Sequence, residues 1–287
     1  MEIFEGRSQL DEGRIVETDD ARIWVHDTGG EGEPLFLVGG FTAGHFAFDF
    51  ARPHLRRYRL LTWEPRGLGR SESLDGRYDG NSAQLWADDL KAVFDRLGLE
   101  RAHLWSAGFG SYITFAFAAR HPESVGALAT YTDVWHGDPV KGYGRIWNVY
   151  RPIVENFGTV GFGARVLANI FDVSNLPWFA RWEARNIEEV LHPETVDDTV
   201  GYGLTRADVR DELSSVRSPT LVVQGALGWD GSAVEESDDP SLNLIRERIP
   251  GVEVATIPDA HPGYVLVQQP ETVAASVHRF IERHPLS

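Results

Sequence analysis

Six short segments of the chain are rich in apolar residues, and three of them end in glycine or are followed by glycine or a charged residue. Such runs predict strands that are buried on both faces, as in a parallel sheet covered by helices. Two earlier segments, residues 14–18 and 22–26, alternate around an Asp19-Asp20 turn and predict half-buried strands. The apolar runs are residues 34–38, 58–63, 102–105, 125–131, 220–225 and 252–257.

Segments with apolar residues at helical spacing lie between most of these runs. Residues 81–97 place leucine, valine and aromatic side chains three or four positions apart, and Gly98 follows as a C-cap. Residues 112–119, 241–248 and 271–282 also predict helices. Strand and helix therefore alternate, which predicts an α/β fold with a mostly parallel, doubly wound sheet.

The alternation stops between residues 134 and 216. This segment has no clear strand but is rich in aromatic residues at helical spacings, among them Trp147. We therefore predict a core formed by residues 1–133 and 217–287, with residues 134–216 inserted as a helical cap. The cap is expected to lie over the carboxyl ends of the strands.

Composition narrows the possible functions. The 287 residues are 42% hydrophobic and 24% charged, with no long apolar run and no secretory leader pattern, so we expect a cytoplasmic protein. The absence of cysteine excludes disulfides and thiolate chemistry. A net charge of −16 disfavours nucleic acid and anionic membranes as partners. The sequence contains no metal-ligand spacing and no phosphate-binding glycine loop, so we expect no cofactor. We also expect a monomer or homodimer whose partner is a small hydrophobic molecule.

Several short motifs, in this order, resemble the α/β-hydrolase superfamily, in particular cap-bearing members of the epoxide hydrolase and esterase type. The resemblance runs from about Arg14 to His284, and the motifs are strongest in combination. It implies the α/β-hydrolase fold, with the insert as the cap domain. The motifs are Gly39-Gly40-Phe41, Glu64 to Ser71, Arg120-His121-Pro122-Glu123, the strand ending at Gly225, and Gln269-Pro270-Glu271.

In that superfamily a G-x-S-x-G turn lifts the nucleophile into the site. Here the corresponding stretch runs from Leu104 to Ser111, and two registers are possible. Counting back one helix length from His121 places Gly108 at the nucleophile position, with no side chain to attack a substrate. The other register makes Ser106 the nucleophile, but it requires two extra residues in the helix. Outside the site, Ser106 would be a buried hydroxyl bonded to nearby backbone.

The other triad positions are displaced as well. The resemblance implies an acid three residues after Gly225 and a histidine seven residues before Pro270. Both places hold glycine, with Asp230 and His261 each two residues away. Three displacements together favour loss or rearrangement of the triad.

Other groups remain for acid–base chemistry. His261, in the loop where the superfamily carries its base, is the strongest candidate for a general base. Asp133 follows a strand directly and could orient a histidine or act as a base; alternatively, it caps the first helix of the insert. Asp230, His136 and His45 are weaker candidates, and His45 could instead be a structural histidine.

An oxyanion hole does not require side chains, because backbone amides form it. The resemblance implies the amides of Phe41 and Phe109, next to Gly108. We expect an apolar pocket lined by Phe41, Phe109, Trp229 and cap aromatics such as Trp147.

Three functions stay open at this point. The first is a lyase, cyclase or isomerase that uses acid–base or templating chemistry on a small hydrophobic carbonyl compound. The second is an esterase or lactonase with a shifted triad of Ser106, His261 and Asp133 or Asp230. The third is a ligand-binding protein without catalysis.

Overall fold

One sheet forms the centre of the protein. The computed structural model describes residues 12–40, 44–138, 142–157, 182, 186–227, 232–233, 235–261 and 265–286. The sheet has nine strands in the order β1-β2-β4-β3-β6-β7-β8-β9, with β5 paired to β2. The strands are β1 (Arg14–Glu17), β2 (Ala21–Asp27), β3 (Pro34–Val38), β4 (Arg59–Trp63), β5 (Glu72–Ser73), β6 (Ala102–Ser106), β7 (Val125–Thr130), β8 (Thr220–Gly225) and β9 (Glu253–Ile257).

Pairing within the sheet is mostly parallel, as predicted. The strands β4, β3, β6, β7, β8 and β9 are joined by parallel pairs, whereas β2 pairs antiparallel with β1, β4 and β5. The fold is therefore the predicted α/β arrangement with a mostly parallel sheet. The pattern did not predict β5, because two residues are too short to show a period.

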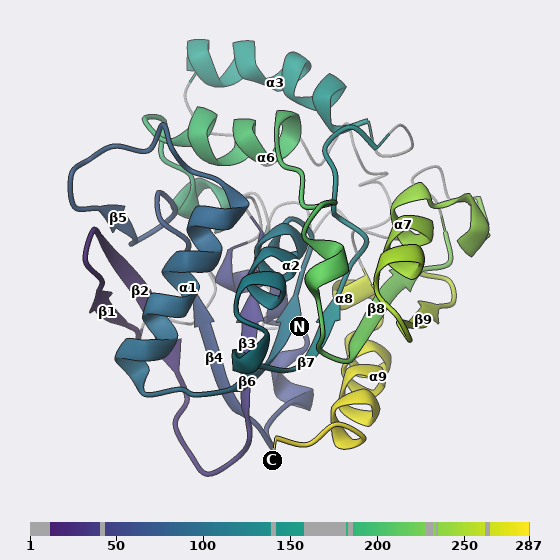
Figure 1. Ribbon diagram of the computed structural model, residues 1–287. Coiled ribbons are helices and arrows are strands. Elements are labelled where there is room, and N and C mark those ends of the chain that lie inside the picture. The colour runs from purple at the N-terminus through teal and green to yellow at the C-terminus, as the bar shows by residue number, and fades with distance from the viewer. Residues whose placement is uncertain are drawn as a thin grey trace.

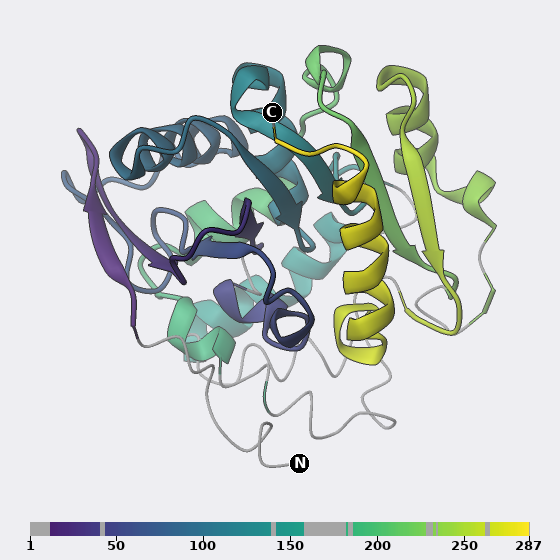
Figure 2. The ribbon, with the colours of Figure 1, turned by 90° about the horizontal axis from the view of Figure 1, so that it is seen from below.

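Helices cover both faces of the sheet. Helices α1 (Ala83–Leu97), α2 (Gly110–Arg120) and α7 (Pro240–Arg248) share one buried cluster with one face. On the other face, α8 (Val265–Gln268) and α9 (Pro270–Glu282) pack in a second cluster with the 3-10 turn η2 (His45–Phe48). Figure 2 shows α1 and α9 on opposite sides of the sheet.

The boundaries of α1 follow from local chemistry. The Ser82 side chain accepts a hydrogen bond from the Leu85 amide at 3.1 Å, which satisfies a free donor of the first turn. Gly98 ends the helix in the left-handed region, at φ +67°.

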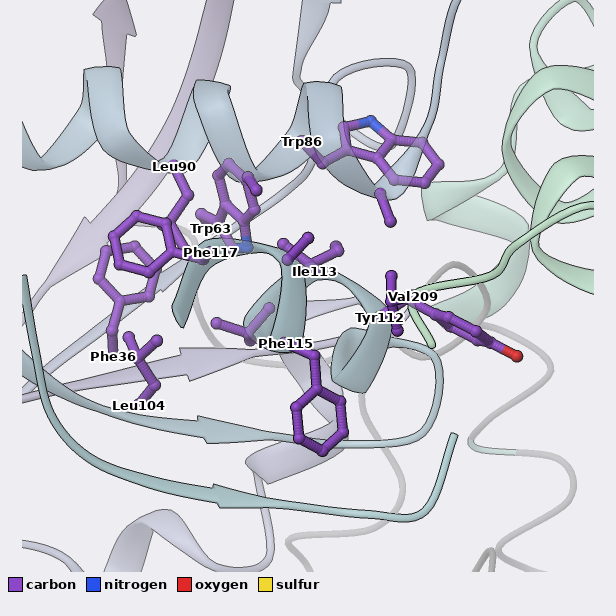
Figure 3. Packing of buried hydrophobic residues seen from close by; sticks show 14 of the residues in the cluster. Phe36, Trp63, Trp86, Leu90, Leu104, Tyr112, Ile113, Phe115, Phe117 and Val209 are labelled. Carbon is purple, nitrogen blue, oxygen red and sulfur yellow. The ribbon is translucent and has the colours of Figure 1, made fainter. Parts of the chain in front are cut away.

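Helix α2 packs against both α1 and the sheet and is buried along most of its length. Figure 3 shows Ile113 and Phe117 of α2 among Trp63, Leu90 and Phe36, which come from two strands and α1. Burial on several sides explains why its apolar residues show no amphipathic stripe. The tight packing also fixes the first turn of α2, which begins directly after the turn that follows β6.

The segment between β7 and β8 contains no strand among its described residues. It contains α3 (Tyr143–Phe157), a π-helical turn (Asp197–Gly201) and α6 (Tyr202–Thr205). Figure 1 shows α3 and α6 side by side at one end of the molecule. The domain boundaries at residues 134 and 216 remain predictions. Among the described residues, no helix is both long and apolar enough to cross a membrane.

Candidate active site

The turn between β6 and α2 places Gly108 at its centre. Gly108 has φ +51°, a backbone conformation that other residues adopt only under strain. A Cβ atom added to Gly108 would meet no described atom within 4 Å. The backbone thus makes a sharp strand-to-helix turn that favours glycine, and no described atom crowds the space beside Gly108. This geometry fits the register with Gly108 at the nucleophile position.

Close packing holds this turn against the end of β3. A Cβ on Gly110 would lie 2.2 Å from the Val38 carbonyl oxygen, and one on Gly40 would lie 2.8 Å from the Phe109 amide nitrogen. The Ala107 amide also donates to the Val38 oxygen at 3.0 Å. Gly40 and Gly110 are therefore required because backbone approaches backbone here. The amide of Phe109, a predicted oxyanion donor, lies at this contact.

Ser106, the alternative nucleophile, lies beneath the turn at the end of β6. It is 0% exposed. Its hydroxyl donates to Thr130 Oγ1 at 2.8 Å and accepts from Thr114 Oγ1 at 3.1 Å. We expected backbone partners, but β7 and α2 each present a threonine hydroxyl to it instead. These bonds tie the two strands and the helix together and leave Ser106 covered.

Asp133 lies just beyond β7 and is 8% exposed. The alternative prediction that it caps the first helix of the insert is wrong, because α3, the first described helix there, begins only at Tyr143. Asp133 is close enough to α2 to act on Tyr112. Burial raises the pKa of Tyr112 well above its ordinary value, and the Asp133 carboxylate raises it further.

His261 lies in the loop after β9 and is half-buried. Its backbone amide donates to Gln268 Oε1 in α8 at 2.8 Å. The same loop packs on the end of β8, since a Cβ on Gly225 would lie 2.1 Å from the Ala260 oxygen. The Leu227 amide donates to that oxygen at 3.1 Å. The loop that carries His261 is therefore fixed to the neighbouring strand.

His136 and Trp147 both contact other residues of the insert. The His136 ring Nδ1 donates to the Ala207 oxygen at 3.0 Å, and its amide donates to the same oxygen at 2.9 Å. His136 thus joins the two ends of the insert. Trp147 is buried in α3, and its ring lies 3.0 Å from a Cβ built on Gly201. Both residues help to hold the insert together.

His45 belongs to a buried charged cluster. It begins η2, and its Nδ1 lies 2.9 Å from Oε1 of Glu64, which is 2% exposed. This close approach favours the ionised form of the Glu64 carboxylate. Glu64 also accepts from the Arg70 amide at 2.7 Å and from Arg70 Nη2 at 2.8 Å. Burial raises the pKa of Glu64, but His45 and Arg70 outweigh it, and the net effect is a lowered pKa.

Sequence reasoning singled out His45 but missed its partners. Glu64 and Arg70 stand in the motif that carried the resemblance. The unusual density of charge directly after a buried strand was the available signal. The predicted site residues Phe41, Trp229 and Asp230 lie outside the described residues.

The candidate groups share one edge of the sheet. Gly108 follows β6, Asp133 follows β7, and His261 follows β9, and these strands lie close together in one parallel series. Carboxyl ends of parallel strands meet at the same edge, where α/β proteins bind ligands. No group of side chains suited to a metal ion occurs in the described part of the chain. The edge therefore offers acid–base groups and backbone amides.

Comparisons with known proteins agree with this architecture. Residues 33–159 match the model of the alpha/beta hydrolase fold family. A 2-hydroxy-6-oxononadienedioate/2-hydroxy-6-oxononatrienedioate hydrolase of Paraburkholderia phymatum is 32% identical over 223 residues, which are 72% of this chain and 74% of that protein. A putative carbamate hydrolase, RutD, of a Caulobacter species is 26% identical over 79% of this chain and 82% of its own.

Solved structures show the same fold. A hydrolase from Pseudomonas aeruginosa superposes with a TM-score of 0.77 at 20% identity, over 95% of this chain and 99% of its own. The enol-lactonase from Burkholderia xenovorans gives a TM-score of 0.75 at 16% identity, over 93% and 99% of the two chains. At these identities the likeness concerns the fold alone.

Proposed function

Because this chain belongs to the α/β-hydrolase superfamily, we propose that it hydrolyses a small, largely apolar carbonyl compound, such as an ester or lactone, by direct attack of water. The observation that carries the proposal is the glycine at the centre of the strand-to-helix turn, where an added Cβ would meet no described atom within 4 Å. A glycine there supplies no nucleophile, so no acyl-enzyme forms at this position. Hydrolysis is favoured because the P. phymatum and Caulobacter relatives are named hydrolases.

The proposed reaction divides the work between His261 and backbone amides. The oxygen of a water molecule bonds to the carbonyl carbon while His261 takes a proton from it. The carbonyl electron pair moves to its oxygen, which the amides of Phe109 and Phe41 stabilise. As the carbonyl re-forms, the bond to the leaving group breaks, and the leaving atom takes the proton from His261; this atom is an oxygen in an ester or lactone and a carbon in a 2-hydroxy-6-oxo-dienoate. Asp133 or Asp230 would orient His261.

The other hypotheses have less support. Lyase, cyclase or isomerase chemistry gains nothing from relatives named as hydrolases. A shifted triad with Ser106 is a hydrolase as well, but complete burial and two hydroxyl partners argue against Ser106 as the nucleophile. A binding protein without catalysis would bind similar compounds and release them unchanged.

Turnover in ¹⁸O-labelled water tests the proposal. The panel contains phenyl acetate, δ-valerolactone and, because of the name of the P. phymatum relative, a 2-hydroxy-6-oxo-dienoate. We expect at least one product to carry ¹⁸O, with no mass increase on protein quenched in acid during turnover. An acyl adduct would contradict direct water attack. A failure to hydrolyse any of the three would favour the binding protein.

A pair of histidine variants identifies the base. His261→Ala should lower kcat by about 10²–10⁴-fold, the usual contribution of a general base. His136→Ala is the matched control, since the His136 ring bonds the Ala207 carbonyl. Its kcat should stay near that of the wild type. An equal loss in both variants would remove His261 from the proposed role.

A further inference from the structure

The loop after β3 is closed by its two described ends. The Gly44 amide donates to the Gly40 oxygen at 3.1 Å, and a Cβ on Gly39 would lie 1.7 Å from the Gly44 oxygen. Gly40 in turn packs on the Phe109 amide. The position of Gly44 therefore sets how this loop meets the strand-to-helix turn. His45, the next residue, is held by Glu64.

The loop after β4 rests on the same carboxylate. Besides its bonds to Arg70, Glu64 lies directly beneath Gly69, where an added Cβ would be 2.4 Å from Oε2. Arg70 stacks over Trp24 with its guanidinium carbon 3.4 Å from the ring centroid. The His45–Glu64 pair is thus the place where the loop after β3 and the loop after β4 are joined.

The insert docks on both of these loops. The Gly69 amide donates to the Val190 oxygen at 2.8 Å, and His192 Nε2 donates to the Gly69 oxygen at 2.6 Å. On the other loop, a Cβ on Gly44 would lie 3.2 Å from Val190 Cγ2. Trp182 packs edge-on against Phe46 of η2, with ring centroids 5.6 Å apart. Contacts of the insert therefore converge on both sides of the His45–Glu64 pair.

We propose that the His45–Glu64 pair is a positioning element, which sets the loop after β3 against the Phe109 amide and couples that setting to docking of the insert. This inference rests on the proposed function, in which backbone amides at this contact stabilise the oxyanion. Such donors act only when they are held in place before the reaction. His45 itself does not touch the substrate in this role.

The Arg66–Asp89 pair provides a matched control. It is also buried, with its charged atoms 2.5 Å apart, and it also holds the loop after β4, but it faces α1 instead of η2. Asp89→Asn should therefore perturb stability without altering the loop after β3.

The test combines hydrogen exchange with kinetics in His45→Leu, His45→Asn and Asp89→Asn. In His45→Leu, amides of residues 39–50 should exchange at least about 10-fold faster, and kcat for a hydrolysed panel compound should fall about 10–100-fold with KM within about 3-fold. His45→Asn keeps an N–H donor and should recover much of both losses. Asp89→Asn should change neither readout.

Two results would overturn the inference. One is unchanged exchange of residues 39–50 in His45→Leu. The other is an equal loss of kcat in His45→Leu and Asp89→Asn, which would indicate a general structural effect. If the wild-type protein hydrolyses nothing, the proposed function fails, and the exchange comparison alone then decides whether the pair sets this loop.

Discussion

The turn after β6 and the loop after β4 differ sharply in their use of side chains. The turn has the left-handed backbone conformation typical of a nucleophile turn but carries glycine at its centre. The loop after β4 is crowded with charge, and Glu64 and Arg66 are buried in ion pairs with residues from other elements. The turn after β6 has a defined backbone geometry without a reactive side chain at its centre. The charged groups of the loop after β4 hold neighbouring segments in position.

This difference separates the residues that hold the loops in position from the groups that would react with a substrate. Among the described residues, glycines and buried ion pairs hold the loops around the site against one another. In the proposed function, Gly108 takes the position that the attacking group usually occupies. Water-mediated hydrolysis requires a frame of this kind, because the frame must hold hydrogen-bond donors and a base around a small mobile nucleophile.

The largest expected effect comes from exchanging glycines within the turn. Gly110→Ala should lower the free energy of unfolding by about 4 kcal/mol, because its Cβ would lie 2.2 Å from the Val38 oxygen. Gly108→Ala should cost only about 1 kcal/mol, from the positive φ alone. Urea denaturation measures both. Equal costs would mean that the space at Gly108 is not open.

Removing the buried carboxylate after β4 should have the next largest effect. Glu64→Gln should lower the free energy of unfolding by about 3 kcal/mol, because the Arg70 donors lose their charged acceptor in a buried setting. Glu72→Gln is the control: Glu72 pairs with Arg22 at 2.8 Å on the surface and should contribute less than about 1 kcal/mol. Similar losses in both would show that the buried cluster adds nothing special.

The pH dependence of stability should separate the two ion pairs of this loop. The pKa of Glu64 is lowered from 4.5, so its contribution is complete above 4.5 and is lost as pH falls through the folded-state pKa. Burial raises the pKa of Asp89 from 3.8 despite Arg66. Folded protein therefore takes up a proton at Asp89 at a higher pH than unfolded protein does. The contribution of Asp89 to the free energy of unfolding becomes more favourable as pH falls towards 3.8.

Free energies of unfolding measured by denaturation between pH 3 and 6 should show both of these opposite pH dependences. Relative to the wild type, Glu64→Gln should lose stability less steeply with acid, and Asp89→Asn should lose it more steeply. Parallel curves for the two variants would contradict the opposite pKa shifts.

The smallest expected effect concerns Ser106. Ser106→Ala should cost about 1 kcal/mol, because Thr130 and Thr114 keep the carbonyl acceptors of Tyr131 and Ser111. Turnover should be unchanged, measured with the same panel. Complete loss of turnover in a folded variant would instead identify Ser106 as the nucleophile.

The sequence predicted the sheet well because buried parallel strands are continuously apolar. Its expectations for the strands at residues 34–38 and 220–225 match β3 and β8. The helix at residues 81–97 begins two residues later than predicted, at Ala83, because Ser82 is the cap. The position of Gly108 in the turn could also be counted from the following helix.

Contacts between distant segments could not be predicted in the same way. Ser106 meets Thr130 only because β6 and β7 are neighbours, and His136 meets Ala207 only because the insert folds back on itself. Likewise, nothing local distinguishes His45 as the partner of Glu64. These pairings depend on the tertiary arrangement, which hydrophobic periodicity does not encode.

The central claim is that Gly108 occupies the place of the nucleophile, and one substitution tests it most directly. Wild-type protein and Gly108→Ser are treated with a fluorophosphonate, and intact mass and peptide mapping follow. We predict no adduct on the wild type and an adduct on residue 108 of the variant, because the turn already has the required backbone and His261 can activate the new hydroxyl. An adduct on Ser106 of the wild type, or none on the folded variant, would contradict the account.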